Sequence, residues 1–266
     1  MPAHFSRLRR ALCVAALSTC LVHAAVSVEG TEPPPPVVAV SDPSPADFLD
    51  TIAKNTKARW RLLFRPPPPT PPTDRGRTAL ILGTLLGDSF LVLQVGDAQQ
   101  FRNNNQDVLT YCRTLGLGEK LLPRLMTQGN LAEKNDWKDL RQEIVDGHQQ
   151  ALKLLRDQKD EDLALLIDVG LGLRLFEIAT AIIVAAPETD VPLLCGSSPA
   201  LLRDLQADFS HISAPKRAEA LMLRVGTLID EIGKLWQDVN KTPLTQAQAA
   251  ETNDKLKGLM HEMQGK

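Results

Sequence analysis

The amino-acid sequence predicts an all-α protein, a multi-helix bundle preceded by a signal peptide and Pro-rich linkers. Hydrophobic residues make up 43% of its 266 residues, which is enough to build a core. Aromatic residues make up only 4%, and because strands draw on aromatic and β-branched residues, this composition favours helices. From residue 77 onward apolar residues recur at helical spacing, and no stretch alternates convincingly with a period of two.

Residues 1–24 have the order of a signal peptide. Three arginines precede an apolar run at 11–22, and a small-x-small cleavage site ends at Ala24. The run is shorter than the roughly 20 apolar residues of a spanning helix, although an uncleaved anchor remains an alternative. The residues before Cys20 resemble a lipoprotein box, with Thr19 in place of the usual small residue. We therefore expect an exported protein, periplasmic or extracellular, with a lipoprotein anchored at Cys20 as the minority interpretation.

The charge balance limits the classes of partner. The formal net charge is −2, and loss of residues 1–24 would remove three arginines and no acid, giving −5. A mildly acidic chain gives no electrostatic reason to expect nucleic acid or anionic lipid as a partner. We expect partners among envelope proteins, no nucleic acid, and membrane association through the N-terminal region only.

Proline-rich stretches divide the N-terminal part of the chain. Residues 25–45 and 65–76 hold the two runs and are expected to be extended, semi-rigid linkers. Between them we expect one amphipathic basic helix over 46–64. Such a helix can lie on a membrane surface or pack on its own domain. Its apolar residues are Phe48, Leu49, Ile52, Trp60 and Leu63, and the basic residues in and after it are Lys54, Lys57, Arg59, Arg61 and Arg65.

Residues 77–190 are expected to form the core of the bundle. A strongly apolar helix is predicted over 78–95, where Gly83 and Gly87 are spaced as GxxxG and Asp88 is the only charge. A transmembrane helix is the alternative, but a central bundle helix fits better because the run is marginal in length and carries an acid. Further helices are expected from a cap at Asp97 to about Leu115, over 119–127, from a cap at Asp136 to about Asp157, and, after a cap at Asp160, over 161–186.

Residues 191–266 are expected to add helices that pack on the same bundle. A loop over 187–199 ends in Ser198-Pro199, a favourable helix start. Thr245 is expected to cap the last helix. The clearest pattern is a heptad seam of apolar residues with alternating spacings of four and three: Leu221, Val225, Leu228, Ile232, Leu235 and Val239.

Motifs that carry chemistry are missing from the sequence. It lacks a phosphate-binding GxxxxGK[ST] loop, an HExxH zinc motif, a GxSxG nucleophile motif and an EF-hand loop, so we expect no cofactor and no metal. Asp208 and His211 have the spacing of one carboxylate–histidine ligand pair, but no second pair accompanies them. His148 is expected to be a satisfied, partly buried side chain. Cys112 and Cys195 would remain after export, either as a disulfide or as buried thiols.

Four charged residues stand inside the two most apolar helices: Asp88, Asp168, Arg174 and Glu177. Because burial of a lone charge costs several kcal/mol, these groups must pair or face a cavity. Arg174 and Glu177 are three residues apart on one helix face, and Asp88 can reach Arg174 from the other helix. Arg174 is the expected centre because a guanidinium can engage two carboxylates. Asp168 is six residues from Arg174 and is expected outside this trio.

Three hypotheses for function follow. The first is a non-enzymatic binding or scaffold protein of the cell envelope, and the missing motifs make us lean against an enzyme. The second is a ligand-binding or enzymatic bundle whose site is the trio Asp88, Arg174 and Glu177. A solvent-open pocket at the trio would favour the second, whereas a sealed cluster with paired charges would favour the first. The third is a peripheral membrane protein that binds through helix 46–64.

Overall fold

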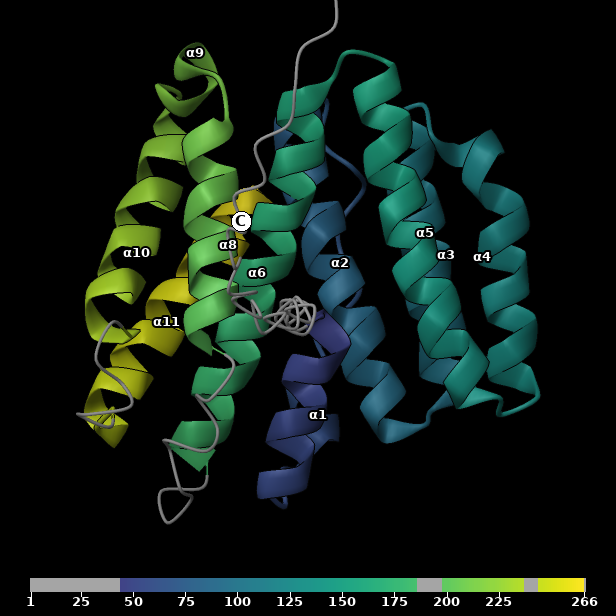
Figure 1. Cartoon of the computed structure of the whole chain (residues 1–266), viewed down its shortest axis with the longest axis horizontal. Coiled ribbons are helices and arrows are strands. Elements are labelled where there is room, and N and C mark those ends of the chain that lie inside the picture. The colour runs from purple at the N-terminus through teal and green to yellow at the C-terminus, as the bar shows by residue number, and fades with distance from the viewer. Residues whose placement is uncertain (1–43, 186–197, 237–243, 266) are drawn as a thin grey trace, which may run out of the picture. The chain divides into compact units, whose positions relative to one another are not determined.

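The computed structural model describes residues 44–185, 198–236 and 244–265. Within these ranges the chain forms helices and no strand, so the predicted all-α class is confirmed (Figure 1). The expected signal peptide, most of the first Pro-rich linker and Cys195 lie outside the described residues. The elements are α1 (Pro45–Asn55), the 3-10 helix η1 (Trp60–Leu63), α2 (Arg75–Val95), α3 (Ala98–Thr114), α4 (Gly118–Glu133), α5 (Trp137–Asp157), α6 (Glu161–Ala185), α8 (Ser198–His211), α9 (Ala214–Arg217), α10 (Ala220–Trp236) and α11 (Gln246–Met263).

Helices α2 and α6 form the centre of the bundle, and their backbones touch at glycines. A Cβ atom on Gly83 of α2 would lie 2.0 Å from the Ile167 carbonyl oxygen. A Cβ atom on Gly170 of α6 would lie 2.1 Å from the Leu80 carbonyl oxygen. Both distances are far below van der Waals contact, so only a residue without a side chain fits at these two positions.

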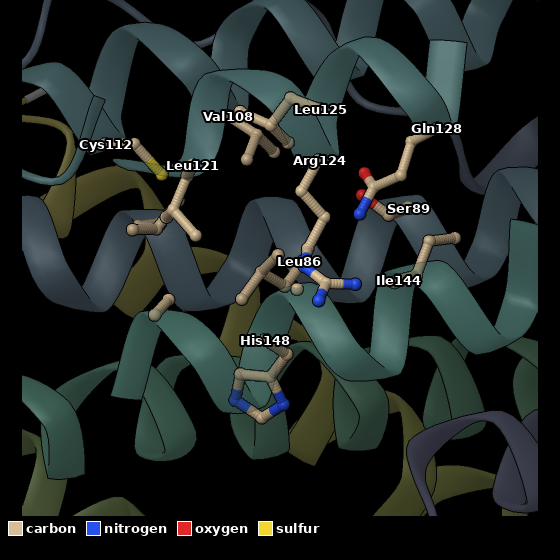
Figure 2. A pocket seen from close by; sticks show the side chains of 13 residues that line it. Leu86, Ser89, Val108, Cys112, Leu121, Arg124, Leu125, Gln128, Ile144 and His148 are labelled. Carbon is tan, nitrogen blue, oxygen red and sulfur yellow. The ribbon is translucent and has the colours of Figure 1, made fainter. Parts of the chain in front are cut away.

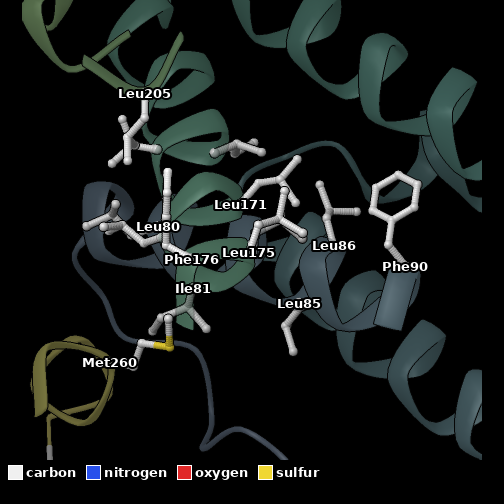
Figure 3. Close-up of a cluster of buried hydrophobic side chains, with 14 of the residues drawn as sticks. Leu80, Ile81, Leu85, Leu86, Phe90, Leu171, Leu175, Phe176, Leu205 and Met260 are labelled. Carbon is white, nitrogen blue, oxygen red and sulfur yellow. The ribbon is translucent and has the colours of Figure 1, made fainter. Parts of the chain in front are cut away.

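The apolar character of α2 follows from its place in the core. By length and composition this helix could cross a membrane, but 83% of its most apolar window is buried inside the bundle. A helix that is hydrophobic all round is a core helix when neighbours surround it. Figure 3 shows side chains of α2 meeting those of α6, with contributions from α8 and α11: Leu80, Ile81, Leu85, Leu86, Phe90, Leu171, Leu175, Phe176, Leu205 and Met260.

The remaining helices cover the central pair from two sides. On one side α3 packs on α2, α4 packs on α3, and α5 closes the group against α4 and α6. On the other side α8 and α11 pack on α6, and α10 contacts both of them (Figure 1). Four residues of the heptad seam, Leu221, Val225, Leu228 and Ile232, are buried in this second group, and Leu235 is partly buried. Val239, its last member, lies outside the described residues.

The helix boundaries follow the capping chemistry expected from the sequence. The carboxylates of Asp97 and Asp136 accept hydrogen bonds from the backbone N–H groups three residues on, and Thr245 forms a capping box with Gln248. Gly96 ends α2 in the left-handed region, with φ of 67°. The predicted N-terminal caps at Asp97, Asp136 and Thr245 are therefore confirmed.

The prediction of a single helix over 46–64 is wrong. Helix α1 ends at Asn55, residues 56–59 are not helical, and η1 follows as a separate short turn. The apolar stripe explains the break: Phe48, Leu49 and Ile52 are buried, but the next positions on that face are polar. Because α1 already packs this apolar face on the bundle, it cannot offer the same face to a membrane.

The second Pro-rich stretch is shorter than expected and lies against the bundle. Helix α2 begins at Arg75, inside the predicted linker 65–76, because the Asp74 side chain caps it. The Tyr111 hydroxyl donates a hydrogen bond to the Pro69 carbonyl at 3.0 Å, and the Thr78 hydroxyl donates one to the Pro72 carbonyl at 2.9 Å. This stretch therefore fixes η1 to the start of α2.

Helix α4 also exceeds its predicted range of 119–127 and contains Pro123.

Candidate functional site

The structure brings Asp88, Arg174 and Glu177 together between α2 and α6. The Arg174 Nε donates to Asp88 Oδ1 at 2.7 Å, and its Nη1 pairs with Glu177 Oε2 one turn further along α6. The Arg174 Nη2 donates to the Leu63 carbonyl at 2.6 Å, so the same guanidinium also holds η1. Arg174 is the centre of the trio, and its side chain is only 1% exposed.

A fourth charge, Arg65, completes this cluster. Its Nε donates to Asp88 Oδ2 at 3.1 Å, its Nη2 pairs with the same oxygen, and Nη2 also donates to the Thr84 carbonyl at 3.2 Å. Two arginines therefore face two carboxylates. We call Arg65, Asp88, Arg174 and Glu177 the charge quartet. The sequence placed Arg65 at the start of a linker, and no local pattern marks it as a partner of Asp88.

The pKa shifts of Asp88 and Arg174 leave both groups charged at neutral pH. Burial raises the pKa of Asp88, but the positive charges of Arg174 and Arg65 outweigh it and bring this pKa below its usual value. Burial lowers the pKa of Arg174 to about 10, against the opposing effect of the Asp88 carboxylate. Arg174 therefore stays protonated and Asp88 ionised at neutral pH.

The quartet is almost closed to solvent. The side chains of Glu177 and Asp88 are 6% and 12% exposed, and Arg65 at 20% is the most accessible member. A cavity of about 100 Å³ touches its outer edge at Arg65 and Asp88, bordered by Asn104 and Asp107. That volume holds a few water molecules, and Arg174 and Glu177 do not line it. Arg174 and Glu177 are thus closed off from solvent, and only Arg65 and Asp88 border this small cavity.

Asp168 lies outside the quartet, as expected, and belongs to a second polar group. Its Oδ1 lies 2.7 Å from His148 Nε2, which joins α6 to α5. The His148 side chain is buried, in agreement with the expectation of a satisfied histidine. Asp168 and His148 also line a cavity of about 290 Å³ that Asp204 and Asp208 of α8 border. We call this cavity the acidic cleft; its apolar walls are Pro45, Leu171, Leu201, Leu205 and Ala207.

The acidic cleft holds a carboxyl group that titrates near neutral pH. Burial, followed by the charges of Asp168 and Asp204, raises the pKa of Asp208 to about 7, although Arg156 and His148 oppose the shift. A group with this pKa can give up or take a proton under physiological conditions. In the sequence Asp208 stands out only for its spacing to His211. The cleft leaves no local signal because its lining residues come from four helices, α1, α5, α6 and α8.

A third cavity lies between α2, α3, α4 and α5 and has only about 20 Å³, enough for about one water molecule. Figure 2 shows Arg124 of α4 reaching into it above His148 of α5. Arg124 is paired there, with Glu143 at 2.9 Å and with Gln150 at 2.7 Å. Cys112 also lines it, and burial raises the pKa of its thiol to about 12. Since Cys195 lies outside the described residues, the disulfide stays a prediction.

Comparison with known proteins gives no relative from which a role can be carried over. No protein-family model, no curated protein and no solved structure matches this chain. Among the residues that the structure describes, no group of three or more His, Cys, Asp or Glu side chains is arranged to hold a metal ion. The described residues form an all-α bundle with a largely buried charge quartet and an acidic cleft.

Proposed function

We propose that this chain is an exported helical-bundle protein that acts as a non-enzymatic binding or scaffold protein of the cell envelope. The closed state of the charge quartet carries this proposal. Arg174 and Glu177 are buried and paired, and neither lines the cavity of about 100 Å³ at the edge of the quartet. Charges placed in this way hold elements in register and do not meet a ligand.

The contacts of the quartet support an architectural role. Arg174 of α6 binds Asp88 of α2 and the Leu63 carbonyl of η1, while Arg65 adds the Pro-rich stretch through the same aspartate. Three segments that are distant in sequence, namely α2, α6 and the stretch from η1 to Arg65, thus meet at one neutral cluster. A scaffold needs a fixed arrangement of helices on which outer faces can bind partners.

Export is the part of this proposal that one experiment tests directly. N-terminal sequencing of the protein from fractionated cells is expected to find a mature start at Ala25 in the envelope fraction. A lipid on Cys20 would replace this expectation with the lipoprotein alternative. Recovery of the chain in the cytoplasm with residues 1–24 intact would refute export.

Scaffold activity is tested by cross-linking in intact cells, followed by identification of the envelope proteins attached to the chain. We expect a defined set of partners that is unchanged when Asp168 is replaced by asparagine. Cross-linking that yields no partner above the background of an unrelated envelope protein would contradict a scaffold role.

The acidic cleft supports a second candidate function, the binding of a small organic cation. The observation that favours it is the His148–Asp168 pair beside Asp208 in an apolar-walled cavity of about 290 Å³. Carboxylates provide the counter-charge and leucines hold an aliphatic part. Titration with spermidine, followed by nuclear magnetic resonance of the His148 ring, is expected to shift its signals in the wild type. Asp168→Asn should abolish the shift, and Asp254→Asn, at an exposed position, should leave it.

A further inference from the structure

The segment between α1 and the second Pro-rich stretch exposes a strip of positive charge. No acid occurs from residue 51 to residue 73, whereas five basic residues do. Arg65 is partly buried in the quartet, but the other four are exposed. Leu62 beside them is 72% exposed, the highest value among the large hydrophobic side chains of the described residues. We call the exposed set the basic edge: Lys54, Lys57, Arg59, Arg61 and Leu62.

The geometry of η1 separates an inner from an outer face. In a 3-10 helix, side chains three residues apart lie over one another. Trp60 and Leu63 are partly buried and pack on the core, so they form the inner face. Arg59 and Leu62 have the same spacing and form the outer face. The exposed leucine is thus placed beside a cation and away from the bundle.

Few acids neutralise the basic edge. Arg61 pairs with Asp97 at 2.9 Å while remaining 68% exposed, and Lys54 acts electrostatically on Asp47. Lys57 and Arg59 form no ion pair with any residue in the described ranges. This local excess of positive charge contrasts with the net charge of −2 for the chain as a whole. A positive strip that includes an exposed apolar side chain complements an anionic bilayer, which attracts the charges and accepts the leucine.

We propose that the basic edge is a membrane-contact surface that binds anionic phospholipid. It replaces the surface expected from a helix over 46–64, because the apolar face of α1 is buried in the bundle. Lys57 and Arg59 supply attraction to phosphate groups, and Leu62 enters the interfacial layer. The inference requires neither the export prediction nor the acidic cleft, because purified protein and lipid are sufficient to test it.

Vesicle co-sedimentation provides the test, with the protein in the form that accumulates in cells. The readout is the salt-sensitive difference in binding between vesicles of equal parts phosphatidylglycerol and phosphatidylcholine and vesicles of phosphatidylcholine alone. Each basic residue near an anionic surface contributes about fivefold in partitioning, so Lys57→Gln with Arg59→Gln should weaken binding about 25-fold. Leu62→Ser should weaken it about tenfold, through loss of buried apolar area.

Matched variants on other surfaces serve as controls. Lys134→Gln with Lys138→Gln removes two exposed charges, and Leu223→Ser changes a leucine that is 59% exposed; both should bind as the wild type does. Equal weakening by test and control variants would overturn the proposal, as would the absence of a phosphatidylglycerol-dependent component. Heparin binding that depends on the cations, with vesicle binding indifferent to Leu62→Ser, would instead assign the strip to soluble polyanions and also overturn it.

Discussion

Replacing Arg174 by methionine should be among the most destabilising single changes in this protein. Methionine keeps much of the side-chain length but removes the hydrogen bond to Asp88, the bond to the Leu63 carbonyl and the pair with Glu177. Asp88 retains Arg65, whereas Glu177 loses the only ion-pair partner that it has among the described residues. The main cost is therefore an uncompensated carboxylate inside the bundle.

The expected loss of unfolding free energy follows from the burial of Arg174. Removal of one partner of a buried pair costs about 3–5 kcal/mol, and Arg174 at 1% exposure is fully in this regime. Total stabilities of single domains are about 5–15 kcal/mol, so the loss is readily measured. Urea unfolding followed by circular dichroism is the assay. Addition of Glu177→Leu should recover part of the loss, because the orphaned charge is removed with it.

A surface arginine provides the matched control for this prediction. Arg102 pairs with Glu133, and the two side chains are 40% and 53% exposed. Arg102→Met should therefore change the unfolding free energy by no more than about 0.5 kcal/mol. Two results would refute the reasoning about an orphaned charge. One is a loss of unfolding free energy for Arg174→Met as small as that for Arg102→Met. The other is a double variant, Arg174→Met with Glu177→Leu, whose loss equals the sum of the two single losses.

Three further predictions concern packing, pH and reactivity. Gly170→Ala should lower the unfolding free energy by about 1–3 kcal/mol or more, because the new Cβ would meet the Leu80 backbone. Gly258→Ala, with open space around it, should raise the unfolding free energy by about 0.5–1 kcal/mol. Thermal melts that rank the two variants in the opposite order would contradict the packing. Since folding raises the pKa of Asp208 from 3.8 to about 7, the folded state binds the extra proton and stability should fall as pH rises through that window. Asp208→Asn should flatten this slope in urea titrations, and an unchanged slope would count against it. Buried Cys112 should react with iodoacetamide only after unfolding, and rapid labelling of the native protein would show that it is accessible.

The sequence predicted those features that local patterns determine. Apolar periodicity and capping residues such as Asp97 and Thr245 placed the main helices, because both signals act within a few residues. The trio around Arg174 was also predictable, since charges in apolar helices must find partners. The break after Asn55 was missed because a ragged apolar face was extended over Thr56 and beyond, where the chain is no longer helical.

The features that sequence reasoning missed depend on contacts across long distances in the chain. Arg65 meets Asp88 only because the Pro-rich stretch folds back on α2. No pattern in the sequence around Arg65 indicates this contact. The acidic cleft joins His148, Asp168 and Asp208 from three helices. Each of these residues looks ordinary within its own helix, and only the packing of α5, α6 and α8 turns them into a cavity with a titrating carboxyl group.

The central claim is that the charge quartet is a structural ion-pair cluster between packed helices and is not a ligand site. One variant tests it most directly: Arg65→Met, Asp88→Leu, Arg174→Met and Glu177→Leu combined. A matched apolar replacement of a buried ion-pair cluster is often neutral. We predict that urea unfolding of this variant will show a smaller loss of stability than Arg174→Met alone, and that cross-linking in cells will capture the same envelope partners as the wild type. A variant that folds with wild-type stability but loses those partners would contradict the claim and make the quartet a binding site.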